Sequence, residues 1–395
     1  MKQINMVHGI SRAALWVFTF SLRLALKTFV IPTRYNCVYS ASDILWPLTY
    51  LSLESEYAEG GLDILRRRLH RHYRHGKVPN SDTLLYRLKK VSRRDAQRML
   101  QRLNENVLSM AKGKGAFLKR AVAAIDLTFI PYYGKPTPYV VHGKYKLGTC
   151  WFHCYAAIRL VERGRRYVIK SRLVTPLDLS EKAQIVEELV TGARRQGLHI
   201  RLLLLDKGFY SYEVIKTLKA MEVKFIIAAP KNNRVKEAIL DYIRTAKGQV
   251  RRFNMKKGGE TVNFNLSIHR LKKKKKNMKN ILELYGAFAT NMAYKKAMRT
   301  WQTIPGDYRR RWGIETGFRV EKGFRALTTS PDETVREIYH QYAVVLENFW
   351  TFHNVREAKR RRIPLCQMVR PIVKVKEFST DFRYFIITNS SIEPP

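Results

Sequence analysis

The sequence predicts an α/β protein in which a mixed sheet is flanked by helices, a helical domain comes first, and a strand-rich insertion comes late. Three observations lead to this prediction. Apolar residues recur at helical spacing through residues 1–118. From residue 119 onward, apolar runs of strand length alternate with amphipathic helical stretches. Finally, 395 residues with 45% hydrophobic content are enough for two or three domains with a substantial core.

The chain is strongly basic. It has 74 Lys and Arg residues against 32 Asp and Glu residues, a formal net charge of +42. This excess goes beyond what solubility requires and indicates a polyanionic partner, for which nucleic acid is the first candidate and anionic lipid the weaker one. Basic runs at residues 66–74, 272–276 and 356–362 suit an extended DNA footprint better than a single basic tail. The lysine run 272–276 is either a solvated loop or a clamp on DNA.

The cysteines and one apolar stretch exclude other classes of protein. The four cysteines form no CxxC pair and have no histidine at zinc-site spacing, so we expect neither structural zinc nor a disulfide framework. A reducing cytoplasm, in association with the nucleoid, is the expected location. Residues 13–31 are apolar, but Arg23 and Lys27 interrupt them, which favours a buried or DNA-facing helix over a membrane span. We therefore expect no membrane partner.

Residues 1–118 are expected to form a helical DNA-binding domain. Ser81 and Ser92 are predicted N-caps, since apolar residues follow each at helical spacing. The basic run 66–74 is suited to following a phosphate backbone. The alternative is a helical buttress for the rest of the protein, because no helix-turn-helix spacing is visible.

The first predicted strand carries an acid. Residues 121–131 form an apolar run that ends in a turn-prone stretch, and Asp126 lies in its middle. A buried carboxylate is costly unless it is paired or binds a metal, so Asp126 is either a metal ligand or a local structural acceptor. Two further strands over 151–161 and 167–174 and a helix over 181–196 complete the first half of the sheet.

A second acid follows a run of leucines. Residues 199–205 predict a buried parallel strand, which ends at Asp206 and the turn residue Gly208 and leads into a helix over 212–221. Residues 223–230 repeat the strand pattern. Open α/β sheets place ligands at the carboxyl ends of their strands, which makes Asp206 a candidate ligand; the alternative is a simple helix cap.

The later part of the chain is expected to contain the insertion, over residues 231–293, where short alternating stretches and an apolar strand replace the earlier pattern. Residues 335–355 predict a core helix. Residues 361–395 are expected to be a basic tail with two short strand-like runs.

One helix is predicted to carry the reactive face. At about 100° per residue, a single α-helix over 308–322 places Tyr308, Arg311, Glu315 and Lys322 within roughly 60° of one another. Arg319, one turn after Glu315, points the same way. A carboxylate among cations suits phosphates and a metal ion, although a solvated face of an amphipathic helix has the same composition.

The spacing of this face, Y-x2-R-x3-E-x6-K, resembles the signature of insertion-sequence DDE transposases, which belong to the RNase H-like superfamily. Asp206 with the following Lys-Gly-Phe is similar to the family's second motif, D-x-G-[FY], and Asp126-Leu-Thr is similar to its first. The resemblance implies an RNase H-like catalytic domain over residues 119–360. Members of the family often carry a strand-rich insertion before the glutamate.

The resemblance also implies roles. Asp126, Asp206 and Glu315 would be the catalytic, metal-binding triad for two Mg²⁺ or Mn²⁺ ions, which prefer hard oxygen ligands. The DNA contacts would be made by Tyr308, Arg311 and Lys322, and the shared helix face adds Arg319 to them.

The implied activity is cutting at the terminal inverted repeats of a mobile element and joining the 3′ ends to target DNA. Double-stranded DNA would be the partner, with a homodimer in the end complex. Trp301 or Trp312 would stack on a flipped base or pack in the core. The alternatives are an RNase H-like structure-specific nuclease and an inactive, transposase-derived DNA-binding protein.

Overall fold

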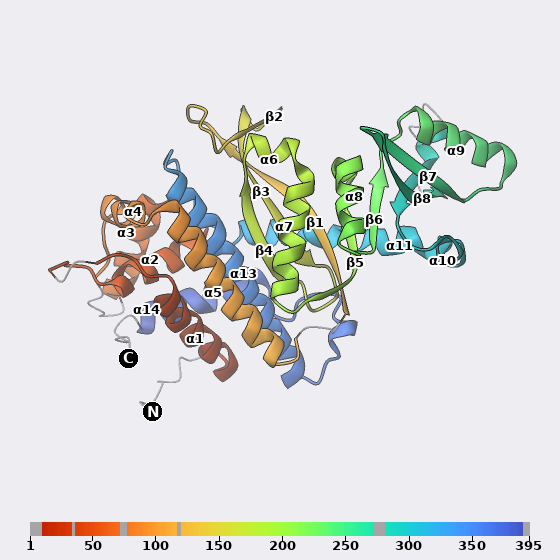
Figure 1. Ribbon diagram of the computed structural model, residues 1–395. Coiled ribbons are helices and arrows are strands. Elements are labelled where there is room, and N and C mark those ends of the chain that lie inside the picture. The colour runs from red at the N-terminus through yellow and green to blue at the C-terminus, as the bar shows by residue number, and fades with distance from the viewer. Residues whose placement is uncertain (1–9, 34–35, 72–76, 117–119, 272–280, 390–395) are drawn as a thin grey trace. The chain divides into compact units, whose positions relative to one another are not determined.

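The computed structural model describes residues 10–33, 36–71, 77–116, 120–271 and 281–389 (Figure 1). The chain forms two compact units. The helical unit consists of Met1–Phe117, Arg163–Ser171 and Thr316–Pro395, and the sheet unit consists of Leu118–Glu162 and Arg172–Glu315. No helix in the described residues is both long enough and apolar enough to cross a membrane.

The helical unit contains the predicted N-terminal helices and the C-terminal part of the chain. Its helices are α1 (Arg12–Thr28), α2 (Ala41–Glu54), α3 (Ala58–Arg71), α4 (Ser81–Lys89), α5 (Arg93–Gly113), α13 (Glu333–Arg360) and α14 (Val375–Asn389). Ser92 caps α5 as predicted, because its hydroxyl accepts from the amide of Asp95 at 3.0 Å. The prediction for α4 is wrong by one residue: Asn80 is the cap, and its side chain accepts from the amide of Thr83 at 2.7 Å.

Helix α13 is the core of this unit, which confirms the prediction of a core helix over 335–355. It is buried along most of its length, and its buried Asn348 is hydrogen-bonded to two neighbouring segments. The side-chain amide of Asn348 donates to Asn104 Oδ1 of α5 at 2.6 Å and to the carbonyl of Val168 at 2.8 Å. These bonds hold α5 and the 163–171 segment onto α13.

The C-terminal segment is helical, so the prediction of strand-like runs there is wrong. Its aromatic residues are typical of strands, but they recur at helical spacing and form one apolar face of α14. The rings of Phe378, Phe382 and Phe385 lie 5.4, 4.4 and 5.7 Å from the ring of Phe18 on α1. Packing on α1 therefore decides the conformation of this segment.

The sheet unit is built on the predicted mixed sheet. Its strands are β1 (Arg120–Tyr132), β2 (Val141–Lys146), β3 (Thr149–Leu160), β4 (Val168–Val174), β5 (His199–Leu205), β6 (Phe225–Ala229), β7 (Val250–Lys257), β8 (Glu260–Arg270) and β9 (Tyr285–Thr290). In the described residues these strands follow the order β2-β3-β1-β5-β6-β9-β8-β7, and β4 pairs with β3 outside this path. The pairs β1/β5 and β5/β6 are parallel, and the other pairs on the path are antiparallel.

Helices cover the parallel part of this sheet. They include α7 (Lys182–Arg195) and α8 (Tyr212–Ala220), which pack against each other, while α7 also contacts β3 and β5 (Figure 1). The apolar face of α7 is fully buried, as its helical spacing predicts. This packing holds β1 and β5 in place; Asp126 lies within β1, and Asp206 directly follows β5.

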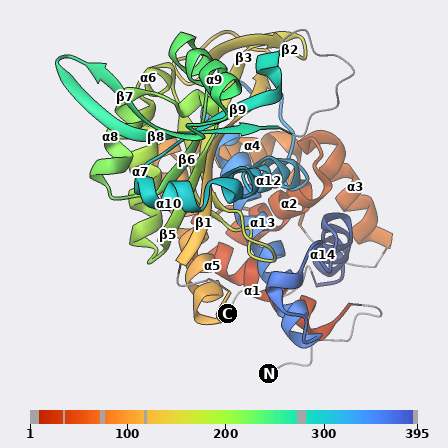
Figure 2. The same ribbon diagram turned by 90° about the vertical axis from the view of Figure 1, so that its right-hand side faces the viewer.

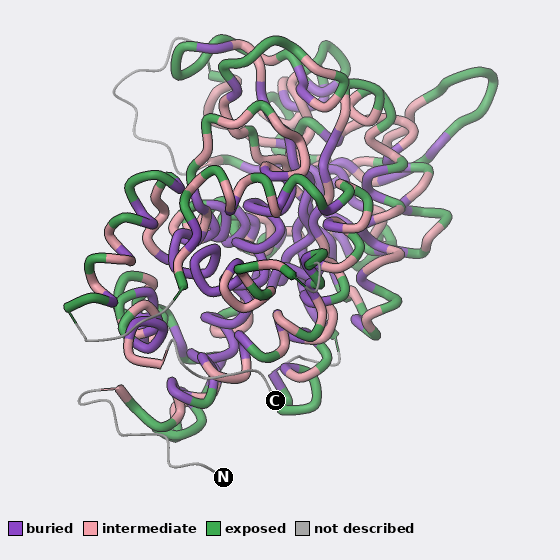
Figure 3. The backbone as a smooth tube through the Cα atoms, turned by 90° about the vertical axis from the view of Figure 1, so that its left-hand side faces the viewer, coloured by how far each residue is buried: buried purple, intermediate pink, exposed green. Residues whose placement is uncertain are grey.

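The insertion extends the main sheet. Strand β9 pairs antiparallel with β6, and β8 and β7 follow it. Helix α9 (Asn233–Thr245) covers these strands through a small core that includes Val235, Ile239 and Leu266. Strands β7 and β8 form a long hairpin (Figure 2) whose tip is exposed (Figure 3). The lysine run 272–276 lies outside the described residues.

The predicted single helix over 308–322 is two helices, so that prediction is wrong in detail. Helix α11 (Ile304–Arg309) ends in a turn, and two residues, 310 and 311, separate it from α12 (Trp312–Lys322). The amides of Gly313 and Ile314 donate to carbonyls three residues earlier, at 2.9 Å each, which tightens the backbone. Gly313 also lies against Val161: a Cβ at this glycine would come within 3.2 Å of the Val161 Cβ. The start of α12 therefore packs closely against the residue after β3, where a side chain at position 313 would be tight.

Candidate active site

The register of the parallel strands brings the two predicted aspartates together. Ile125 of β1 pairs with Leu205 of β5, so Asp126 and Asp206 follow side by side at the carboxyl edge of the sheet. Asp126 is mostly buried, and one of its oxygens accepts from the amide of Leu127 at 2.9 Å. Asp206 precedes a short 3₁₀ helix, but its side chain makes no capping hydrogen bond there. Simple helix capping therefore does not account for Asp206.

A single guanidinium connects the three predicted carboxylates. Arg311 Nη1 lies 2.9 Å from Asp126 Oδ2, and Nη2 lies 2.7 Å from Glu315 Oε1. Nη2 also lies 3.9 Å from Asp206 Oδ1. The Arg311 side chain is only 10% exposed, so it fills the space between the carboxylates instead of extending into solvent. The turn before α12 gives Arg311 this position, one turn before Glu315.

Burial changes the acidity of the site. It raises the pKa of Asp126 to about 6, while the Leu127 amide and the Arg311 charge act to lower it, and the charges of Asp206 and Glu315 act to raise it. Asp126 is therefore ionised at neutral pH. Three carboxylates and one guanidinium leave a net formal charge of minus two at this edge of the sheet. Such a site attracts cations.

Tyr308 lies next to this group. Its ring is 5.6 Å from Arg311 Cζ and 4.8 Å from the ring of Phe288. Burial raises the pKa of Tyr308 to about 12, with the Arg311 charge acting to lower it and Asp206 to raise it. The phenol is therefore protonated and can donate a hydrogen bond, but it is a poor nucleophile at neutral pH.

The donor set fits a hard divalent cation. Carboxylate oxygens are the ligands that Mg²⁺ and Mn²⁺ prefer, and two of the three acids, Asp206 and Glu315, are open to solvent. In the conformation of the described chain, no three Asp, Glu, His or Cys side chains are close enough together to hold one metal ion. The guanidinium of Arg311 lies where their oxygens would otherwise converge.

The other predicted residues differ in their exposure. Arg319 and Lys322 are exposed on α12, past the point where the chain enters the helical unit. Trp301 donates to the carbonyl of Ile268 at 2.9 Å and is partly buried. Trp312 is exposed, so core packing is the wrong role for it.

Sequence reasoning missed two residues that support the site. Glu162, buried just past β3, accepts from the amide of Val122 on β1 at 3.1 Å. Its carboxylate also lies 3.6 Å from Arg310 Nη2. Glu162 therefore ties the strand that carries Asp126 to the turn that carries Arg311. An acid after an apolar strand pattern is the same signal that indicated Asp206, but here no motif surrounded it.

Comparison with known proteins places the chain in a family. The family described as transposase DDE domain matches residues 118–336, more than half of the chain. No curated protein sequence matches it. Among solved structures, the chain is similar to the piggyBac transposase in its synaptic complex with hairpin DNA. The TM-score is 0.54 and the identity 12%, over 98% of this chain and 82% of that one.

The structural likeness confirms the predicted RNase H-like α/β fold, and the family match confirms the resemblance found in the sequence. The chain belongs to the transposase DDE domain family, whose members generally use divalent metal ions.

Proposed function

We propose that this protein is a DNA transposase that cuts at the terminal inverted repeats of an insertion sequence and joins the freed 3′ ends to target DNA. The observation that carries the proposal is the convergence of Asp126, Asp206 and Glu315 on one guanidinium at the carboxyl edge of the sheet. Membership of the transposase family supports the same conclusion.

The three carboxylates would hold two divalent ions, Mg²⁺ or Mn²⁺. When bound, such ions supply Lewis-acid stabilisation on both sides of a phosphodiester. Asp126 is fixed by its strand and by the Leu127 amide, so it would anchor the ions. Asp206 and Glu315 are more exposed and would complete the ligand set from the side that faces solvent. No covalent protein nucleophile is needed, which agrees with the protonated state of Tyr308.

Arg311 would serve two states of the protein. Without bound ions, its guanidinium neutralises part of the carboxylate charge. With ions bound to the carboxylates, the Arg311 guanidinium would be free to bind a DNA phosphate with two parallel hydrogen bonds. Tyr308, Arg319 and Lys322 are further proposed contacts with the DNA backbone.

The pKa of Asp126 predicts how ion binding depends on pH. Its folded-state pKa, about 6, lies above the ordinary value of 3.8, so the folded protein binds this proton more tightly than the unfolded chain does. Lowering the pH through 6 therefore does not reduce metal-free stability through this group, but it removes a ligand. We expect Mn²⁺ affinity at pH 5 to be about tenfold weaker than at pH 7. Thermal shift titrations would measure it, and equal affinities at both values would contradict the assignment.

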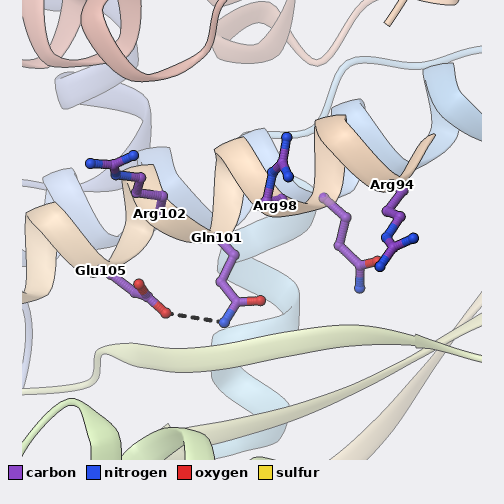
Figure 4. Close-up of a pocket in the computed structure, with 6 residues that line it drawn as sticks. Arg94, Arg98, Gln101, Arg102 and Glu105 are labelled. Carbon is purple, nitrogen blue, oxygen red and sulfur yellow. Dashed lines mark hydrogen bonds between the residues drawn. The ribbon is translucent and has the colours of Figure 1, made fainter. Parts of the chain in front are cut away.

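The helical unit offers a surface for the DNA backbone. Helix α5 has a pocket along one face, lined by Arg94, Gln97, Arg98, Gln101, Arg102 and Glu105 (Figure 4). The three arginines recur every four residues and are exposed, so they form one stripe of positive charge. The net charge of +42 supports the same kind of partner.

Salt dependence would test this surface. Each phosphate contact steepens the fall of log K with log salt by about 0.9 for duplex DNA, so replacing the three arginines with alanine should reduce the slope by up to about 2.7. The matched triple lysine variant keeps the charges and should keep the slope. An unchanged slope in the alanine variant would show that the stripe does not contact DNA.

Products distinguish the proposed reaction from its alternative. The protein would be incubated with Mg²⁺, a target plasmid and duplexes taken from the DNA that flanks its coding sequence. We expect cleavage at inverted repeats, 3′ ends joined to the plasmid, and two protein chains in the end complex. Cleavage of branched DNA without joining would instead favour a structure-specific nuclease. No metal-dependent cleavage of any of these substrates would contradict the proposal.

A further inference from the structure

The edge of the sheet that carries the carboxylates also carries an extension. In the described residues, β1 pairs with β5 only as far as Ile125, yet its pairing with β3 continues to Tyr132. Strand β2 pairs with β3 alone. The end of β1 and the β2–β3 hairpin therefore project past the carboxyl end of β5, next to Asp206, at the label β2 in Figure 1. We call residues 133–148 of this extension the finger.

The solvent-exposed side chains of the finger include both large hydrophobic residues and lysines. Tyr133, Tyr145 and Leu147 are 69%, 77% and 65% exposed. Its exposed cations are Lys135, Lys144 and Lys146. The sequence has no acidic residue between Asp126 and Glu162. Aromatic rings interleaved with lysines are a surface on which bases stack while phosphates pair with ammonium groups.

The tip of the finger is held in an unfavourable backbone conformation. Leu147 and Gly148 form the two-residue turn between β2 and β3, and both have positive φ, 54° and 83°. Such turns usually have Asn or Asp in the first position, because a leucine there is strained. The Tyr133 hydroxyl donates to the Leu147 carbonyl at 2.8 Å, which fixes the turn and the tyrosine ring together. Strain that is kept in place around an exposed apolar side chain points to a role in binding.

We infer that the finger opens a base step of duplex DNA near the cleavage site. Leu147 would enter the step as an apolar wedge, as leucines do in proteins that kink DNA. Tyr133 and Tyr145 would stack on the unpaired bases, and the lysines would hold the adjacent phosphates. The inference rests on the proposed function in taking DNA as the partner and the carboxylates as the cleavage site.

The length of β1 after Asp126 limits the distance between the carboxylates and the finger. Tyr133 follows Asp126 by seven residues, and an extended chain spans about 3.3 Å per residue, so the finger begins at most about 23 Å from Asp126. Duplex DNA rises about 3.4 Å per base pair. A duplex that runs along β1 with its scissile phosphate at the carboxylates would therefore meet the finger within about seven base pairs of that phosphate.

Permanganate reactivity of unstacked thymines would test the inference, with cleavage measured in parallel on the same duplex. With the wild-type protein we expect reactive thymines within about seven base pairs of the cut, the limit set by the length of β1. Leu147→Asn places a favoured residue in the turn, so folding should be kept, and Tyr145→Ala alters only an exposed ring. Each variant should reduce the reactivity at least tenfold. Leu177→Asn, at an exposed leucine of the same unit, is the matched control and should change nothing.

The two readouts separate this inference from the proposed function. Cleavage by the wild-type protein without reactive thymines, or reactivity that persists in Leu147→Asn and Tyr145→Ala, would overturn the finger's role and leave the proposed function standing. Reactivity that depends on Leu147 without any cleavage would support the finger and count against the transposase reaction. A complex that binds no duplex would overturn both.

Discussion

Asp206→Asn is expected to remove metal-dependent DNA cleavage while folding and DNA binding are kept. The substitution keeps the shape of the side chain but removes the charge that would hold a divalent ion. Ions at such sites supply several kcal/mol of transition-state stabilisation, so the cleavage rate should fall by about 1000-fold or more. Asp206 is the best residue for this test because it is partly exposed and lies 3.9 Å from Arg311, so the fold depends little on it.

The control variant tests whether the loss of a carboxylate outside the active site also slows cleavage. Asp241→Asn also removes one carboxylate from the sheet unit, where Asp241 pairs with Arg251 at an exposed position on α9. It should leave the cleavage rate within about twofold, as surface substitutions usually do. Asp126→Asn should behave like Asp206→Asn in cleavage. If either active-site variant cut its duplex at the wild-type rate, the assignment of the metal ligands would be withdrawn.

Arg311→Ala is expected to lower the stability of the metal-free protein and to raise its affinity for Mn²⁺. Without metal, Asp126 and Glu315 lose the guanidinium that lies 2.9 and 2.7 Å from them, and the free energy of unfolding should fall by about 2 kcal/mol, a figure reduced for the exposure of Glu315. The same change removes the group that competes with cations, so affinity for Mn²⁺ should rise. Cleavage should still slow by about 100-fold, since the phosphate would lose its positioning contact.

Thermal melting in EDTA and in a Mn²⁺ series would measure both effects. Ion binding should restore much of the stability that the variant loses, because a ligand that binds only the folded state raises its stability. Arg311→Lys keeps one charge but cannot reach two carboxylates, so it should be intermediate. Arg309→Ala, two residues away and exposed, is the matched control. A variant with unchanged metal-free melting and unchanged ion affinity would show that Arg311 does not fill the ion site.

The sequence was sufficient for those features that depend on local pattern. Two apolar runs of strand length, one with Asp126 in its middle and one with Asp206 directly after it, predicted β1 and β5. The proximity of the two acids followed from the rule that ligands gather at the carboxyl ends of parallel strands, and the β1/β5 register agrees with it. The roles of these acids as metal ligands stay a prediction.

Long-range packing explains what the sequence did not predict. A helical wheel assumes a continuous helix, but the chain turns at residues 310–311 between α11 and α12, and Arg311 of this turn lies beside the carboxylates. An exposed arginine contacting DNA was expected, and a nearly buried one bridging acids was found. Strand β2 was missed because its polar residues carry little strand signal and its pairing with β3 sets its conformation.

Anomalous diffraction from crystals grown with Mn²⁺ would test the central claim most directly. We expect Mn²⁺ bound by oxygens of Asp126, Asp206 and Glu315 at about 2.0–2.2 Å, with the Arg311 guanidinium moved out of the space between them. Crystals of Asp206→Asn under the same conditions should show weaker or absent peaks there. Mn²⁺ found only at surface carboxylates, with Arg311 still bonded to Asp126 and Glu315, would contradict the account.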